Sequence, residues 1–506
     1  MGRRSRGCAM ARNAVQLITY ADRLAGDLPG LARLLGTPPW SEAFGGVHIL
    51  PFFTPFDGAD AGFDPVDHTA VDPRLGGWED VRAVAQGRDL MVDVIVNHVS
   101  ADSAAFRDWR EHGDASEHAG MFLTMAAVYP YGATEGELAR IYRPRPGLPF
   151  TPYTVAGEKR LVWTTFTPQQ VDLDIAHPGA RAYLDSILDA IAGAGATSVR
   201  LDAVGYAVKT PGETCFMTLD TFAFIGEFTE RCRARGLEVL VEVHSYYRRQ
   251  IEIGAAVDRV YDFALPPLVL HALGTGDGEP LARWLEVRPP NAVTVLDTHD
   301  GIGVIDVGAD QTAPDAPGLL PPAELDALVE RIHEASGGTS RLATGAAASN
   351  LDLYQVNCTF YDALGADDHA YLAARALQFF TPGIPQVYYV GALAGRNDVA
   401  LLRASGVGRD INRHRYSAGE ASHELQRPVV RALMALCAFR TALPVFDGDF
   451  AFRLEDGVLT MGWRAGDSET QLTVDLLSHR AGLWWRHAGV EGSTDDLLAD
   501  PPRLAS

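Results

Sequence analysis

Polar residues with acid–base potential end four short apolar runs of this 506-residue chain. Residues 93–98 read DVIVNH, residues 199–203 read VRLDA, residues 241–244 read VEVH, and residues 296–300 read LDTHD. Charged side chains are costly inside an apolar strand unless they are paired. A single one is most often a structural ion pair, but four runs that end in the same way indicate a functional site.

The alternation of side chains along a strand brings several of these groups together. Arg200 and Asp202 share one face of their run, and Glu242 and His244 share one face of theirs. We expect Arg200 to keep the neighbouring carboxylate ionised at neutral pH. Three carboxylates, the third being Asp300, suit cleavage of a glycosidic bond with retention, which needs one nucleophile and one protonated acid. A third negative charge helps the acid to keep its proton.

The elements that must position these residues alternate between β-rich runs and helical stretches such as 218–235 and 371–380. Near-continuous apolar runs are typical of parallel strands covered on both faces. Eight such units predict an α/β fold, a (β/α)8 TIM barrel, whose sites lie after the carboxyl ends of the strands. A doubly wound sheet is the alternative that strand counting leaves open. The eight expected strands are 15–20, 46–52, 90–99, 198–204, 237–244, 260–265, 292–296 and 386–390.

Two intervals interrupt the alternation and indicate insertions after strands 3 and 7. Each follows the carboxyl end of a strand, where long loops are usually functional. After about residue 445 the pattern changes to short strands with turns, at 450–454, 458–463, 471–476 and 483–487, which predicts a small C-terminal β domain. The expected division is barrel 1–99 (1–11 disordered), insertion 100–177, barrel 178–300, insertion 301–364, barrel 365–445 and β domain 446–506.

Composition excludes several classes of function. The chain carries 65 acidic and 43 basic residues, and the net charge of −22 argues against nucleic acid or an anionic membrane surface as a partner. Only two of the basic residues are lysines, Lys159 and Lys209, and neither belongs to a phosphate-binding loop. The sequence contains no run of about 18 apolar residues, so no membrane-spanning helix is predicted. Five scattered cysteines without a CxxC pair favour a reducing cytoplasm over a zinc site or disulfides. Met10 is an alternative start to Met1.

The four polar strand ends resemble the four short motifs of the α-amylase superfamily in spacing and order. That family is a (β/α)8 barrel with a domain inserted after its third strand. Within it, the chain resembles the sucrose phosphorylases from about residue 15 to the end, least closely after residue 445. The segments that carry this second resemblance are 49–65, 141–150, 242–247, 296–304 and 348–356.

One departure from general amylases supports the phosphorylase branch. Many amylases place Lys-His shortly after the nucleophile, where the two residues help to hold a sugar, and this chain has Gly205 and Tyr206 there. In some amylases the asparagine matching Asn97 supports a calcium site. The sucrose phosphorylases are similar to one another in lacking that metal, so the resemblance implies no metal and no cofactor.

The resemblance implies a role for each matching residue. Asp202 would be the nucleophile, Glu242 the acid and base, and Asp300 the group that stabilises the transition state. Phe63 would be a platform for the glucose ring, and Arg200 would orient Asp202. The remaining glucose contacts would be Asp60, His98, His299 and Arg409.

Phosphate and fructose are expected to contact the insertions. Because the net charge opposes steering of an anion, phosphate needs a local cationic pocket, for which the resemblance implies Arg145, assisted by His244 and Tyr354. The segment around residue 346 is expected to be a mobile loop that alternates between fructose and phosphate. Further expected contacts are Tyr142, Phe166, Gln170, Tyr206, Asp352 and Gln355.

The implied activity is the reversible phosphorolysis of sucrose to α-D-glucose 1-phosphate and D-fructose through a covalent glucosyl-enzyme, by a homodimer in the cytoplasm. The alternatives are a sister phosphorylase acting on sucrose 6′-phosphate, glucosylglycerol or glucosylglycerate, a transglucosidase or hydrolase, and a non-catalytic sugar-binding barrel. Non-catalytic relatives usually lose a catalytic carboxylate, and all three are present here.

Overall fold

The computed structural model describes residues 11–310, 315–344 and 355–504. The chain divides into two compact units. The first contains Ile49–Ala85 and Leu90–Val243, and the second contains Arg12–His48, Gln86–Asp89 and His244–Ser506.

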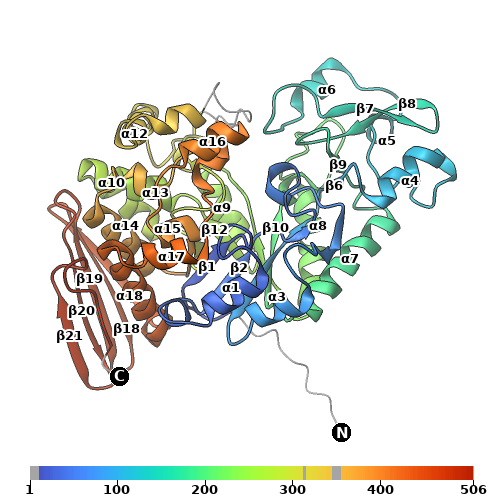
Figure 1. Ribbon diagram of the computed structural model, residues 1–506. Coiled ribbons are helices and arrows are strands. Elements are labelled where there is room, and N and C mark those ends of the chain that lie inside the picture. Colours follow the sequence, from blue (N-terminus) through green and yellow to red (C-terminus); the bar gives the residue numbers. More distant parts are fainter. Residues whose placement is uncertain (1–10, 311–314, 345–354, 505–506) are drawn as a thin grey trace, which may run out of the picture. The chain divides into compact units, whose positions relative to one another are not determined.

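Eight parallel strands form a closed barrel in the order β1-β16-β13-β12-β11-β10-β5-β2. This confirms the predicted α/β class and (β/α)8 fold, and it excludes the open doubly wound sheet. The strands, several of which are labelled in Figure 1, are β1 (Gln16–Thr19), β2 (Gly46–Ile49), β5 (Asp89–Ile95), β10 (Ser198–Asp202), β11 (Glu238–Val241), β12 (Arg259–Asp262), β13 (Ala292–Thr294) and β16 (Ile384–Tyr388).

Strand register sets which polar residues become neighbours. In the first unit β10 pairs with β5, which places Arg200 opposite Asp93, and with β11, which places Arg200 opposite Leu240. In the second unit β16 pairs with β1 and β13, and β13 pairs with β12.

Capping residues define the helices that follow the strands. Thr218 accepts a hydrogen bond from the backbone of Thr221 and begins α8, while Asp367 accepts from Ala370 and begins α14. Helices of the first unit outside the segment between β5 and α7 are α3 (Trp78–Val84), α7 itself (Pro178–Gly193) and α8 (Leu219–Arg233). Those of the second unit are α1 (Leu28–Leu35), α2 (Trp40–Ala43), α9 (Tyr247–Gly254), α10 (Leu265–Thr275), α11 (Glu279–Val287), α12 (Pro322–Ala335), α13 (Phe360–Ala363), α14 (Asp368–Phe380), α15 (Tyr389–Ala392), α16 (Val399–Ser405), α17 (Ala418–Glu424) and α18 (Pro428–Ala442).

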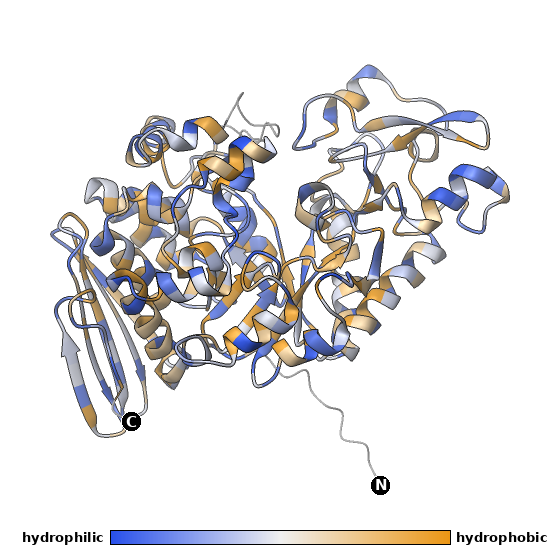
Figure 2. Ribbon diagram, in the orientation of Figure 1, coloured by the Kyte–Doolittle hydropathy of each residue, from blue (hydrophilic) through white to orange (hydrophobic). Residues whose placement is uncertain are grey.

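The segment between β5 and α7 builds a small core of its own within the first unit. Phe106 and Trp109 of α4 pack on Phe122 in this core, and Figure 2 shows that the rest of α4 is largely hydrophilic. The elements here are β6 (His98–Ser100), α4 (Ala104–His112), α5 (Met125–Val128), α6 (Glu135–Arg140), β7 (Phe150–Val155), β8 (Glu158–Trp163) and β9 (Gln170–Asp172). Strands β3 (Phe53–Thr54) and β4 (Asp67–Val71) form a separate hairpin.

The C-terminal sheet packs on helix α14, as Figure 1 shows. Every residue of α14 from Ala370 to Phe380 is buried, and Trp463 donates a hydrogen bond to the carbonyl of Phe380 at 2.8 Å. The antiparallel sheet consists of β17 (Asp449–Glu455), β18 (Val458–Ala465), β19 (Ser468–Asp475), β20 (Ala481–His487) and β21 (Val490–Thr494). The last of these strands was not predicted from the sequence.

The third predicted strand, 90–99, is wrong at its carboxyl end. Barrel strand β5 stops at Ile95, and His98 begins β6, which pairs antiparallel with β9. The eighth, 386–390, is shifted, because β16 spans Ile384–Tyr388 and Val390 lies in α15. Among the described residues, no helix is both long enough and apolar enough to cross a membrane.

Candidate active site

Arg200 joins three carboxylates in the first unit. One of its terminal nitrogens, Nη1, lies 2.5 Å from Oδ1 of Asp93 and 3.0 Å from Oδ1 of Asp202. The other, Nη2, lies 2.5 Å from Oε1 of Glu242. The side chains of Arg200 and Asp93 are 2% and 0% exposed, whereas those of Asp202 and Glu242 are 13% and 14% exposed. One buried guanidinium therefore orients the two more accessible carboxylates, and the fully buried Asp93 on the neighbouring strand anchors it.

His98, a predicted glucose contact, lies against the backbone of a second one, Phe63. Its Nε2 lies 2.9 Å from the carbonyl oxygen of Phe63 and its Nδ1 lies 3.3 Å from Nδ2 of Asn97. A carbonyl only accepts and an amide nitrogen only donates, so these two contacts favour a neutral imidazole with its proton on Nε2. The amide nitrogen of Gln170, 3.1 Å from the same Nε2, is then directed at the Phe63 carbonyl and not at the ring. Burial lowers the pKa of His98, which agrees with the neutral form. Gln170 Nε2 also donates to the Phe63 carbonyl, at 3.1 Å.

Asp60 lies on a short 3₁₀ turn after strand β3, η1 (Ala59–Gly62), and Phe63 is the residue that directly follows this turn. Asp60 has a left-handed backbone, with φ of 51°, and its charge influences the pKa of His98. The guanidinium carbon of Arg200 lies 5.7 Å from the centroid of the Phe63 ring. The ring that was predicted as a sugar platform is thus supported by the arginine that holds the carboxylates.

Three predicted aromatic contacts form one cluster, to which the structure adds Phe216. Tyr142 and Tyr206 are stacked at 6.4 Å between centroids with an angle of 5° between their planes. Phe216 lies 5.0 Å from Tyr142 and 4.6 Å from Tyr206. Phe166 contacts Tyr206 edge-on at 5.3 Å and lies 5.3 Å from His98. Phe216 follows Asp202 in the sequence, but no motif there distinguishes it from an aromatic residue of the core.

The predicted phosphate ligand Arg145 has a second arginine close by. Burial is the largest influence that lowers the pKa of Arg143, and the charge of Arg145 contributes. Arg143 donates to the carbonyl oxygens of Leu148 at 2.6 Å and Phe166 at 3.0 Å. The proline-rich segment therefore presents two neighbouring cations, of which sequence reasoning had selected one.

Lys209 occupies the surroundings of the asparagine that supports calcium in some amylases. Its Nζ lies 2.8 Å from Oδ1 of Asn97 and 2.8 Å from Oδ2 of Asp172, and it also donates to the carbonyl oxygen of Tyr206. Because an ammonium already takes these oxygens, a divalent cation would have to displace it, and the residues present do not fit a metal here.

In the second unit Asp300 pairs with Arg409. Nη1 of Arg409 lies 2.8 Å from Oδ1 of Asp300, and Nε2 of His299 lies 3.6 Å from Oδ2 of Asp300. Arg413 donates to the carbonyl of His299 at 2.9 Å, and Asn412 donates to that of Asp300 at 3.4 Å. His299, Asp300 and Arg409 are therefore brought together. The backbone of His299 and Asp300 is held by Arg413 and by Asn412 of the 3₁₀ turn η7 (Gly408–Asn412).

His244 belongs to a second group of this unit. Its Nδ1 lies 3.0 Å from Oδ2 of Asp306, a residue that is fully buried, and its ring stacks on Phe263 at 3.8 Å. Gln355 Nε2 lies 3.5 Å from the other ring nitrogen, and Gln355 Oε1 accepts from the backbone of Gly301. Asp306 was missed in the sequence, where it stands outside the motifs. Asp352 and Tyr354 lie outside the described residues.

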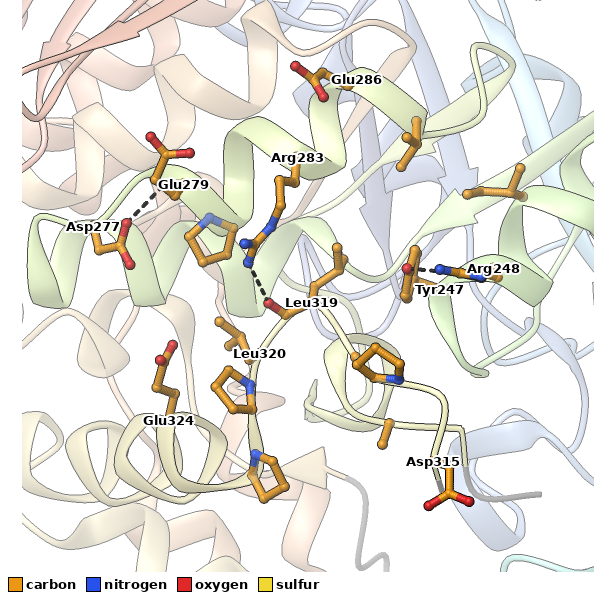
Figure 3. Close-up of a pocket in the computed structure, with 18 of the residues that line it drawn as sticks. Tyr247, Arg248, Asp277, Glu279, Arg283, Glu286, Asp315, Leu319, Leu320 and Glu324 are labelled. Atoms are coloured by element: carbon orange, nitrogen blue, oxygen red, sulfur yellow. Dashed lines mark hydrogen bonds between the residues drawn. The ribbon is translucent and has the colours of Figure 1, made fainter. Parts of the chain in front are cut away.

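A groove of about 1190 Å³ in the second unit contains none of the predicted site residues. Figure 3 shows that it runs between α9, α11 and the proline-rich segment before α12, with Arg283 donating to the carbonyl of Leu319 at 3.0 Å. The charged residues that line it are Arg248, Glu252, Asp277, Glu279, Arg283, Glu286, Asp315 and Glu324.

A closed parallel barrel whose polar residues follow the carboxyl ends of its strands defines an enzyme-type barrel of the kind found in α-amylases. Comparison with known proteins agrees. Residues 41–220 match the family model "Alpha amylase, catalytic domain", and residues 445–502 match "Sucrose phosphorylase, C-terminal".

Relatives extend this match to nearly the whole chain. The sucrose phosphorylase of Bifidobacterium adolescentis is 55% identical over 98% of this chain and 100% of its own length. That of Agrobacterium vitis is 57% identical over 93% of this chain and 97% of its own. The crystal structure of sucrose 6F-phosphate phosphorylase from Thermoanaerobacter thermosaccharolyticum superposes with a TM-score of 0.87 at 36% identity, covering 96% of this chain and 98% of that one. The chain belongs to the sucrose phosphorylase family.

Proposed function

We propose that the protein is a sucrose phosphorylase, which converts sucrose and phosphate reversibly to α-D-glucose 1-phosphate and D-fructose. The observation that carries the proposal is the contact of one buried arginine with both Asp202 and Glu242. The identity of 55–57% with sucrose phosphorylases supports sucrose as the donor.

In the first step, a carboxylate oxygen of Asp202 attacks the anomeric carbon of the glucose unit. The bond from that carbon to the fructosyl oxygen breaks, and Glu242 gives its proton to the departing oxygen. In the second step, a phosphate oxygen attacks the same carbon, the ester to Asp202 breaks, and the proton of the phosphate returns to Glu242. Two inversions at one carbon give net retention.

The other predicted residues would bind the two substrates. Asp300 would stabilise the positive charge that develops on the sugar, and Arg409 beside it would fix its orientation. Phosphate would bind Arg145, with the charge of Arg143 close by. A cationic pair on the insertion offsets the long-range repulsion expected from the net charge of −22. His244, Asp352, Tyr354 and Gln355 would contact phosphate or fructose.

Phosphate dependence is the test of this proposal. Enzyme, sucrose and phosphate should yield glucose 1-phosphate and fructose in equal amounts, and Asp202→Ala should abolish turnover without changing the circular dichroism spectrum. Free glucose released at one rate with and without phosphate would instead identify a hydrolase or transglucosidase. Undiminished turnover by the variant would show that the nucleophile is another residue.

The relative at 36% identity, whose substrate is sucrose 6F-phosphate, makes a sister activity the second candidate. A panel of sucrose, sucrose 6′-phosphate, glucosylglycerol and glucosylglycerate, each with phosphate, separates the candidates by kcat/KM. We expect sucrose to give the highest value.

The expected homodimer, cytoplasmic location and division of the chain into a barrel, two insertions and a β domain are also proposals. Light scattering in solution tests the first, because a homodimer of a 54.6 kDa chain has about twice that mass.

A further inference from the structure

Lys209 is the one buried lysine of the two in the chain, and the proposed reaction does not use it. Its side chain is 2% exposed, whereas Lys159 lies exposed on β8. The ammonium of Lys209 has three oxygen partners. They are the side-chain oxygen of Asn97 at 2.8 Å, a carboxylate oxygen of Asp172 at 2.8 Å, and the carbonyl oxygen of Tyr206.

These three oxygens belong to three segments that each carry a site residue. Asn97 precedes His98 and its amide nitrogen lies 3.3 Å from Nδ1 of that histidine. Asp172 lies in β9, directly opposite His98 in the β6–β9 pair. Tyr206 lies in the 3₁₀ turn η3 (Val204–Tyr206) that follows Asp202 by one residue.

We propose that Lys209 is a positioning residue for the reaction. Its ammonium sets the amide of Asn97 so that Nδ2 faces His98, and it ties the turn after the nucleophile to the insertion strand β9. This inference rests on the proposed function and deepens it, because His98 and Tyr206 are its expected sugar contacts.

The hydrogen-bond directions support this role. An ammonium only donates, so Asn97 must present its oxygen to Lys209 and its amide nitrogen to His98. His98 can accept that bond on Nδ1 only while the imidazole is neutral. Asp172 in turn accepts from the backbone nitrogen of Thr165 at 3.0 Å and from its hydroxyl at 2.5 Å. The ammonium of Lys209 is thus held between Asn97 and an Asp172 carboxylate that Thr165 fixes in place.

The charge of Lys209 has a second effect on His98, which pH dependence can measure. The charged or titratable groups that face His98 are Asp172, Lys209, Asp60 and His68. Burial lowers the pKa of His98, and Lys209 lowers it further. Replacing the ammonium by an uncharged side chain leaves Asp172 negative, so the pKa of His98 rises and its protonation begins at higher pH.

The test compares Lys209→Met with wild type and with Lys159→Met, the matched control at the exposed lysine. Methionine keeps an unbranched side chain only one heavy atom shorter and removes the charge. At pH 7 we expect kcat/KM for sucrose to fall at least about 10-fold in Lys209→Met and to stay within twofold in the control. The acidic limb of the kcat/KM profile should move up by about half a pH unit or more, which a merely structural role would not cause. Activity within twofold of wild type, or an unshifted limb, overturns the proposal.

Two further measurements keep the proposal testable if Lys209→Met fails to fold. Asn97→Asp keeps an oxygen for Lys209 but removes the donor to His98, so the acidic limb should again move up, and an unshifted limb contradicts the role of Asn97. In native wild type, an amine-acylating reagent should modify Lys159 and spare Lys209 by mass spectrometry. Equal rates for the two lysines refute the buried contacts without reference to activity. Absence of phosphorolysis by wild type would be a failure of the proposed function alone.

Discussion

The buried contact between Arg200 and Asp93 makes a quantitative prediction about stability. Arg200→Met removes the guanidinium that lies 2.5 Å from a carboxylate with no exposed surface. Loss of one partner from such a buried pair costs about 3–5 kcal/mol, because the remaining charge stays in a medium of low polarity. Asp93→Asn removes the other charge, but Arg200 keeps Asp202 and Glu242 as partners. Its cost should be nearer that of one hydrogen bond to a charged group, about 1.5–3 kcal/mol.

The double variant separates this explanation from simple loss of packing. With both charges removed, Asp93→Asn in the background of Arg200→Met should raise the melting temperature relative to Arg200→Met alone, because the buried carboxylate is gone. The expected order of melting temperature is wild type, Asp93→Asn, the double variant and then Arg200→Met.

Scanning fluorimetry or calorimetry at one fixed scan rate measures this order. The chain has two compact units, so the midpoints are compared directly between variants at the same scan rate and are not converted into free energies. At about 2.1 cal/mol/K per residue, a loss of about 3–5 kcal/mol lowers the midpoint of a 506-residue chain by about 3–5 °C, so the reasoning is refuted if Arg200→Met melts within about 1 °C of wild type. It is also refuted if the double variant melts below both single variants, since the charge would then not be the cause.

Three other expectations follow from buried groups. Burial lowers the pKa of His68 to about 3. Below about pH 6.5 the unfolded state therefore binds a proton that the folded state does not, and the folded state loses about 2 kcal/mol of stability between pH 6.5 and 5. Between these two pH values the melting temperature of His68→Phe should decline less than that of wild type, and an equal decline would contradict this. Burial raises the pKa of the Cys358 and Cys437 thiols to about 12, so both should be alkylated slowly at pH 8 until the protein unfolds, as mass spectrometry can follow. Trp463→Phe removes the hydrogen bond to Phe380 and should cost about 1 kcal/mol, seen as a lower melting temperature with unchanged kcat.

The sequence was sufficient to predict the barrel and the proximity of Arg200 to Asp202, because both depend on short-range patterns. Period-two alternation predicted that Arg200 and Asp202 lie on one face of their strand, and in the structure Nη1 of Arg200 lies 3.0 Å from Oδ1 of Asp202. The same reasoning failed at His98, because β6 pairs with a strand about 70 residues further along the chain, a contact that no local run of apolar residues reveals.

The sequence did not identify residues that orient or neighbour the predicted site residues. Lys209 was used only to exclude a phosphate-binding loop, although its rarity in a chain with 43 basic residues was itself a signal. Asp306 stands outside the motifs, and only the fold shows that it contacts His244, a predicted site residue. Arg143 lies within the segment 141–150, two residues before Arg145, and was passed over although the sequence already places it there. Sequence patterns identify groups that could react, whereas the partners that orient them come from long-range packing.

The burial of helix α14 on all sides has a consequence for how the protein is made. Its last residue, Phe380, is synthesised about a hundred residues before β20 ends at His487. At about 5–20 residues per second, the ribosome therefore leaves one face of an apolar helix uncovered for on the order of 5–20 seconds. During that interval the nascent chain is exposed to aggregation, and expression at lower temperature or with added chaperones should raise the soluble yield of the full chain.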